Sequence, residues 1–151
     1  MKLEEALQST KFSSELQKAG LNILYTAWWL KTLISRQLKT LGLTNEQYNV
    51  LRILKGKHPE YMCVKDIGCR MIEKNSNVPR IIDRLELKKL VSRSNSAFDK
   101  RETVMTLTKD GINILDLANK RVNEVFKHSV ELNEQEASEL NKLLEKIREK
   151  E

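Results

Sequence analysis

The sequence contains no run of apolar residues that approaches the ~20 needed for a transmembrane helix. Five glycines and two prolines occur among 151 residues, which leaves little material for a flexible linker and predicts one continuous domain. The chain opens MKLEEALQST, with acidic side chains where a secretory signal peptide has its apolar core. We therefore expect a cytoplasmic protein without membrane segments.

Motifs that mark enzymes and metal sites are also missing. The sequence has no GxSxG, no P-loop, no dinucleotide-binding glycine pattern and no HExxH. His58 and His128 lie far apart in the chain and belong to no Cys/His cluster, which argues against a zinc site. We expect no catalytic activity, no metal and no cofactor.

Cysteine is equally scarce, because Cys63 and Cys69 are the two in the chain. Two cysteines are too few for a disulfide scaffold, and a reducing cytosol would keep both as thiols. On one helix, their spacing of six residues would place them on different faces. We expect buried structural cysteines, and the alternative is a thiol-based redox sensor.

Positive charge is present in excess and is concentrated in the middle of the chain. The net charge is +6, and residues 52–101 hold 13 Lys/Arg against 6 Asp/Glu, whereas the rest holds 14 against 15. An excess of this kind indicates a polyanionic partner without naming it. The pattern predicts a nucleic-acid-reading module between two nearly neutral flanks.

Apolar residues recur at helical spacing from about Lys11 to Leu41, and Gly42 follows as a helix stop. A helix of about 30 residues is long for a globular protein, so we expect it to pack against another chain. Thr44 and Gln47 form a predicted capping box for the next helix. Two further helices are expected at 64–71 and from an N-cap at Asn75 or Ser76 to about Leu90.

The period then changes from 3.6 residues to 2, which predicts two strands, 90–93 and 102–107, joined by residues 94–101. Helices capped by Thr108 and Asn133 complete the chain. The fold class is mainly α with a small β-hairpin wing, that is, a winged helix-turn-helix with terminal dimerisation helices. We expect one domain over 1–151, with a DNA-binding lobe at 43–107 and dimerisation helices at 11–41 and 108–150.

Four segments in this order resemble the MarR family, the multiple-antibiotic-resistance-type regulators. They are LTNEQYNVLRIL at 43–54, VPRIIDRLELKKLV at 78–91, Asp99-Lys100-Arg101, and the pattern of Val104, Leu107, Thr108 and Gly111. The resemblance implies a homodimer that binds a pseudo-palindromic operator on double-stranded DNA, usually as a repressor, and that is released by a small aromatic effector. Three positions depart from the family pattern: Pro79 replaces a hydroxyl residue, Lys89 a glycine and Lys100 an arginine.

Helix-turn-helix proteins place the start of the recognition helix near base edges, and winged proteins bring a hairpin to the neighbouring groove. The candidate DNA contacts are Lys65, Ser76, Asn77, Arg80, Arg84, Asp99, Lys100 and Arg101. Ser76, Asn77 and Arg80 are expected at bases, and Lys65 at phosphate. Arg84 is expected at phosphate or paired with Asp83 or Glu86.

In the wing, Arg101 is expected to enter the minor groove, where a guanidinium meets a narrow, negative channel. Asp99 is expected to hold Arg101 or the wing backbone in place, as the resemblance also implies. The alternatives are an ordinary turn that begins at Asp99 and, for the basic helix face, simple solvation.

Tyr25, Trp28 and Trp29 gather in the middle of the first long helix. We expect them to pack in the dimer core, and the alternative is an effector pocket of the kind that the resemblance implies. A different class of function also stays open at this point: a helical adaptor whose basic middle docks an acidic protein partner.

Overall fold

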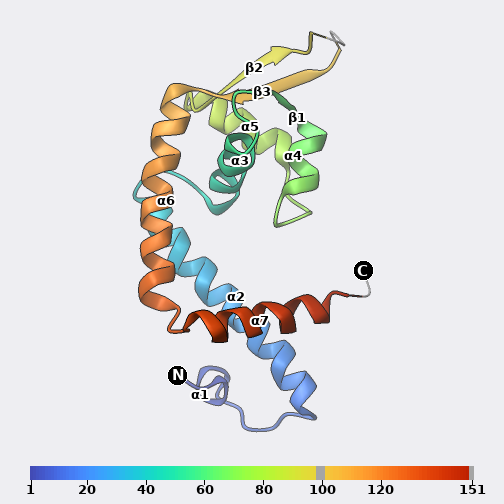
Figure 1. Ribbon diagram of the computed structural model, residues 1–151, viewed down its shortest axis with the longest axis vertical. Coiled ribbons are helices and arrows are strands. Elements are labelled where there is room, and N and C mark those ends of the chain that lie inside the picture. The colour runs from blue at the N-terminus through green and yellow to red at the C-terminus, as the bar shows by residue number, and fades with distance from the viewer. Residues whose placement is uncertain (98–100, 150–151) are drawn as a thin grey trace.

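The computed structural model describes residues 1–97 and 101–149. A winged lobe lies at one end of the molecule, and long helices extend from it to the other end, where α1 lies (Figure 1). The elements are α1 (Leu3–Leu7), α2 (Glu15–Lys39), α3 (Asn45–Lys55), β1 (Met62–Cys63), α4 (Val64–Arg70), α5 (Val78–Leu87), β2 (Val91–Asn95), β3 (Thr103–Leu107), α6 (Lys109–Ser129) and α7 (Glu134–Ile147).

The lobe consists of α3, α4 and α5 packed beneath an antiparallel sheet of order β1-β3-β2. In that sheet Val91 pairs with Leu107 and Met62 pairs with Met105. Buried side chains from all three helices and from the sheet form a single core, which includes Leu51, Ile67, Ile82, Leu85 and Met105. The predicted fold class is confirmed, and β1 is an addition to the predicted two-stranded hairpin.

The long helices start where short polar side chains can cap them. Ser14 accepts a hydrogen bond from the amide of Gln17, so α2 begins at Glu15 and not near Lys11. α2 packs against α6, and Thr108 and Asn133 cap α6 and α7 as predicted. The short helix α1 was not predicted.

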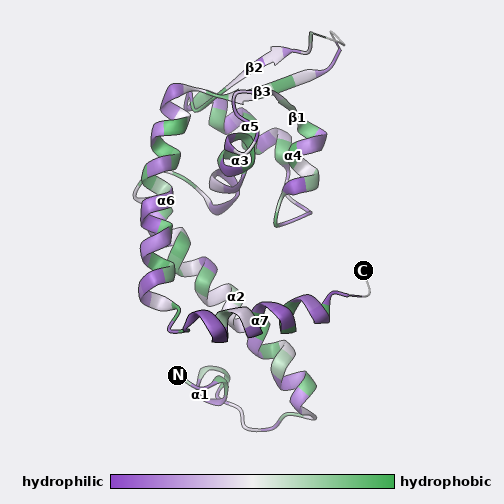
Figure 2. Cartoon of the chain, viewed as in Figure 1, coloured by the Kyte–Doolittle hydropathy of each residue, from purple (hydrophilic) through white to green (hydrophobic). Residues whose placement is uncertain are grey.

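Apolar side chains remain uncovered on the helices outside the lobe. No residue of α7 is buried among the described parts of the chain, and Figure 2 shows green apolar segments interspersed along α2. Within residues 1–97 and 101–149, no helix combines the length and apolarity required to cross a membrane.

The recognition helix α5 is shorter than predicted. Its N-cap is Asn77, and neither Asn75 nor Ser76 fills that role. It ends at Leu87, and Lys89 then takes a left-handed backbone with φ of 58°, as its place at the family's glycine position suggested. Leu87, the last residue of α5, is 83% exposed and does not join the core.

Gly111 in the first turn of α6 lies directly against the end of α5. A Cβ at this position would lie 2.0 Å from the carbonyl oxygen of Leu90, which no side chain can occupy. The same turn is fixed by Thr108, whose amide donates to Leu90 O at 3.2 Å and whose hydroxyl donates to Lys89 O at 2.7 Å. The motif of Leu107, Thr108 and Gly111 is therefore a docking site for the chain that leaves α5.

Candidate nucleic-acid interface

α5 has one buried face and one basic face because its apolar residues repeat at helical spacing. Val78, Ile82 and Leu85 are buried in the lobe, while Arg80 and Arg84 are exposed on the other side, one turn apart. Pro79 follows Val78 in the first turn, where the missing amide proton costs little. The two arginines are thus carried on a rigid helix whose start is capped.

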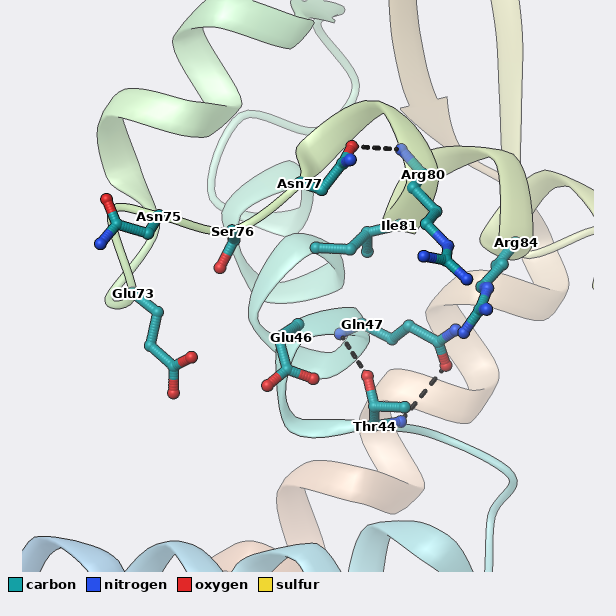
Figure 3. Close-up of a pocket in the computed structure, with 10 residues that line it drawn as sticks. All are labelled: Thr44, Glu46, Gln47, Glu73, Asn75, Ser76, Asn77, Arg80, Ile81 and Arg84. Atoms are coloured by element: carbon teal, nitrogen blue, oxygen red, sulfur yellow. Dashed lines mark hydrogen bonds between the residues drawn. The ribbon is translucent and has the colours of Figure 1, made fainter.

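A polar hollow of about 410 Å³ lies beside this face. It is lined by Thr44, Glu46, Gln47, Glu73, Asn75, Ser76, Asn77, Arg80, Ile81 and Arg84, and Figure 3 shows the two arginines across the hollow from the two carboxylates. Asn77 uses its side-chain oxygen to accept from the amide of Arg80 at 3.2 Å. The Ser76 hydroxyl oxygen is buried and has no hydrogen-bond partner among the described residues.

The acidic residues of α5 are paired with a residue of the wing. Arg93 in β2 contacts Asp83 through Nη2 at 2.5 Å and Glu86 through Nε at 3.2 Å. The expected alternative pairing of Arg84 with Asp83 or Glu86 is therefore absent. Over residues 1–97 and 101–149, neither Arg80 nor Arg84 lies in a salt bridge, so both guanidinium groups are available to an external anion.

Lys88 joins the end of α5 to the start of α3. Its ammonium donates to Gln47 Oε1 at 2.9 Å and to the carbonyl oxygen of Gly42. Gln47 is only 3% exposed, and the same Oε1 also accepts from the amide of Thr44 at 3.2 Å. Lys88 therefore stabilises the lobe by joining two of its helices.

The wing brings a further arginine to the same end of the molecule. Arg101 is exposed after the hairpin turn, and the amide of Ser96 donates to Glu102 O at 2.8 Å, where the two strands meet. Two predicted contacts, Asp99 and Lys100, lie outside the described residues. Lys65 is exposed in the first turn of α4, and its phosphate contact stays a prediction.

Sequence reasoning did not single out Gln47 or Arg93 as residues that organise this surface. A signal for Arg93 was present, because Asp83 and Glu86 are two acids three residues apart on an otherwise basic helix face. Two acids on a basic face favour pairing with a cation, and Arg93 on the neighbouring strand β2 is that cation.

A model of the MarR family matches residues 43–103, which span this lobe from the start of α3 to the start of β3. Residues 43–103 of the chain therefore match the MarR family of transcription regulators. It is 28% identical over 104 residues to the HTH-type transcriptional regulator MhqR of Bacillus subtilis (strain 168), an alignment that covers 67% of this chain and 64% of MhqR.

Solved MarR structures share the fold over nearly the whole chain. AbsC, a MarR family transcriptional regulator from Streptomyces coelicolor, is 25% identical with a TM-score of 0.78, covering 93% of this chain and 97% of AbsC. MepR from S. aureus, solved as a DNA complex, is 23% identical with a TM-score of 0.77, covering 92% and 98%. MarR proteins are transcription regulators and not enzymes, in agreement with the expectation of no catalytic activity.

The chain also contains an apolar cavity of about 390 Å³ between α2, α3 and α6. Its lining includes Ala27, Leu30, Ile34, Tyr48, Arg52, Met71, Ile72, Val122 and Phe126. The Tyr48 hydroxyl donates to Asn119 Oδ1 at 2.8 Å, and burial raises the pKa of Tyr48 despite the nearby Arg52 guanidinium. Tyr25, Trp28 and Trp29 do not line this cavity.

The tryptophans and cysteines occupy less enclosed places. The Tyr25 and Trp28 rings are 5.5 Å apart on α2, and Trp28 is largely exposed. Cys63 is half-buried and accepts from the amide of Asp66 at 3.4 Å, whereas Cys69 is exposed. The expectation that both cysteines are buried is therefore wrong for Cys69, because its side of α4 faces solvent.

Proposed function

We propose that the chain is a cytoplasmic homodimeric repressor that binds a pseudo-palindromic operator. The observation that carries the proposal is the charge arrangement on α5. Arg80 and Arg84 are exposed and lie in no salt bridge within the described residues, while Asp83 and Glu86 are both paired with Arg93. A helix with free arginines beside a hairpin is suited to a major groove and its neighbour.

The dimer is supported by an apolar stripe on α2. Leu16, Leu24 and Trp28 are 87%, 68% and 60% exposed, and their spacing of eight and four residues places them on one side of the helix. Leu140, Leu143 and Ile147 of α7 are exposed as well. Exposed apolar surface of this extent marks an interaction site, and a second copy of the chain would cover both faces.

Release by a small ligand is supported by the cavity between α2, α3 and α6. Its walls are mostly apolar, and the polar side chains at its edges include Tyr48, Arg52 and the Lys31–Glu73 pair. That combination suits an aromatic molecule with one polar substituent. A ligand that favours a dimer with the wrong spacing of its α5 helices would release DNA by shifting populations.

The function is tested by selecting bound fragments from the source genome and titrating one of them with salt. A repressor dimer is expected to select a palindrome whose half-sites are about 34–36 Å apart, and its affinity is expected to fall steeply as salt rises. Flat, negligible binding to every duplex would contradict the proposal and favour the adaptor for an acidic protein.

The thiol-sensor alternative has its own test. The exposed position of Cys69 makes this cysteine the relevant one. Treatment with peroxide is expected to leave operator binding unchanged, with C69S as the control, because Cys69 lies on α4 and not on the basic face of α5 or in the wing. If peroxide abolished operator binding by the wild type but not by C69S, Cys69 would be established as a redox sensor.

A further inference from the structure

Lys31 in α2 connects a dimerisation helix to the DNA-reading lobe. Its ammonium forms an ion pair with Glu73, in the loop that leads to α5, and lies 3.8 Å from Glu46 Oε1 in the first turn of α3. The side chain of Asn45 also approaches the Lys31 carbonyl, at 3.5 Å. One cation on α2 therefore holds two carboxylates from two different elements of the lobe.

Glu46 and Glu73 form the partition between two hollows. Both line the apolar cavity between α2, α3 and α6, and both line the polar hollow beside Arg80 and Arg84. Figure 3 shows them across that hollow from the two arginines. A ligand in the apolar cavity can therefore displace either carboxylate. Such a displacement changes the negative charge beside Arg80 and Arg84.

The charges on this face determine whether a phosphate backbone can approach. Free carboxylates beside Arg80 and Arg84 would compete with DNA for the guanidinium groups and would repel phosphate over a Debye length of about 8 Å. Lys31 and Arg93 together form ion pairs with four acidic residues around the face, which are Glu46, Glu73, Asp83 and Glu86. Arg93 belongs to the lobe itself, whereas Lys31 belongs to α2.

We propose that Lys31 is a positioning residue for DNA binding, which holds Glu46 and Glu73 away from Arg80 and Arg84. The inference rests on the proposed function and adds to it a route by which α2 controls affinity. When α2 shifts relative to the lobe, the two carboxylates lose their cation and turn to the arginines across the hollow. DNA affinity then falls because the carboxylates compete with DNA for Arg80 and Arg84, although α5 itself keeps its place in the lobe.

The protonation states agree with this role. The Glu73 hydrogen bond raises the pKa of Lys31, although burial opposes it. Burial acts to raise the pKa of Glu46, but hydrogen bonds from its own backbone and Thr44, together with Lys31, bring it below its usual value. Lys31 and Glu46 are therefore charged at neutral pH, and the effect is a matter of position.

The experiment compares operator affinities of Lys31→Met, Glu46→Gln/Glu73→Gln and the triple variant that combines all three changes. Lys31→Met is expected to bind about three- to tenfold more weakly at low salt, and the triple variant is expected to regain wild-type affinity. Lys31→Arg keeps the cation and is expected to bind like the wild type. Lys120→Met on α6 removes the same charge outside both hollows and controls for net charge.

Three results would overturn the proposal. They are unchanged binding by Lys31→Met, a loss as large in Lys120→Met, and a triple variant as weak as Lys31→Met, which would mean that Lys31 contacts phosphate itself. The unfolding temperatures of all variants are measured in parallel, so that a loss of stability can be distinguished from a loss of positioning. If Lys31→Met does not fold, the operator affinity of Lys31→Arg is compared with that of the wild type instead. A wild-type chain that ignores DNA would instead contradict the proposed function.

Discussion

Arg80 and Arg84 are chemically alike but differently placed on the reading surface. Arg80 lies in the first turn of α5, three residues after the Asn77 cap, whereas Arg84 lies next to Gln47 at the start of α3 (Figure 3). The start of a recognition helix is the part that reaches base edges. The two arginines are therefore expected to divide base reading and backbone contact between them.

Replacing Arg80 with Ala is expected to relax the preference for one base pair in each half-site, at a cost of about 1–3 kcal/mol in operator binding. Replacing Arg84 with Ala is expected to weaken binding to all DNA sequences alike and to make the affinity depend less steeply on salt concentration. Selection of bound sequences and a salt titration measure the two effects. A loss of base preference in Arg84→Ala alone would reverse the assignment.

Arg101→Ala is expected to weaken operator binding by a few kcal/mol at most and to leave the unfolding temperature intact. The residue is exposed, so its removal takes little from the core, while a minor-groove contact would be lost. Mobility-shift titration and thermal unfolding provide the two readings. Normal binding by this variant would exclude Arg101 as the wing contact.

At the scale of elements, Arg93 fixes the hairpin to the recognition helix. Arg93→Met is expected to leave Asp83 and Glu86 without their cation and the wing without its anchor. Base preference should then be lost at the outer positions of the operator and retained at the positions that α5 reads. Sequence selection with the variant tests this, with Arg93→Lys as a control that keeps the charge, and an even loss at all positions would indicate a merely structural role.

The close packing at the junction of α5 and α6 requires glycine at position 111. Gly111→Ala is expected to destabilise the folded chain by about 1–3 kcal/mol, because the added methyl group would force α6 away from the Leu90 carbonyl. Denaturant unfolding measures the change. Gly20→Ala in α2, where an added Cβ meets nothing within 4 Å, is the matched control and should be neutral or stabilising.

At the scale of the whole molecule, the apolar stripe on α2 should decide the oligomeric state. Leu24→Glu is expected to yield a folded monomer with weak operator binding, since the side chain is largely exposed in the single chain and a buried, unpaired carboxylate would oppose association. Sedimentation measures the change. Tyr61→Glu, on an exposed residue of the winged lobe, should remain dimeric, and a dimeric Leu24→Glu would place the interface elsewhere.

Sequence patterns predicted the lobe well because its helices have long, periodic apolar faces and strong caps such as Thr44 and Thr108. They missed β1, since two residues show no period, and they misplaced the α5 cap because Asn75, Ser76 and Asn77 are all good capping residues. The pairing of Lys31 with Glu73 spans 42 positions. Only the packing of α2 against the lobe brings such distant charges together.

The amide of Gln47 has a mechanical consequence. Because one buried oxygen holds both the start of α3 and Lys88 after α5, these two helices are locked in a fixed mutual angle. A ligand cannot tilt α5 alone without breaking a buried polar contact, so the lobe swings as one block on α2 and α6. In the proposed homodimer, such a swing would change the distance between the two α5 helices and, through Lys31, the affinity of each lobe for its half-site.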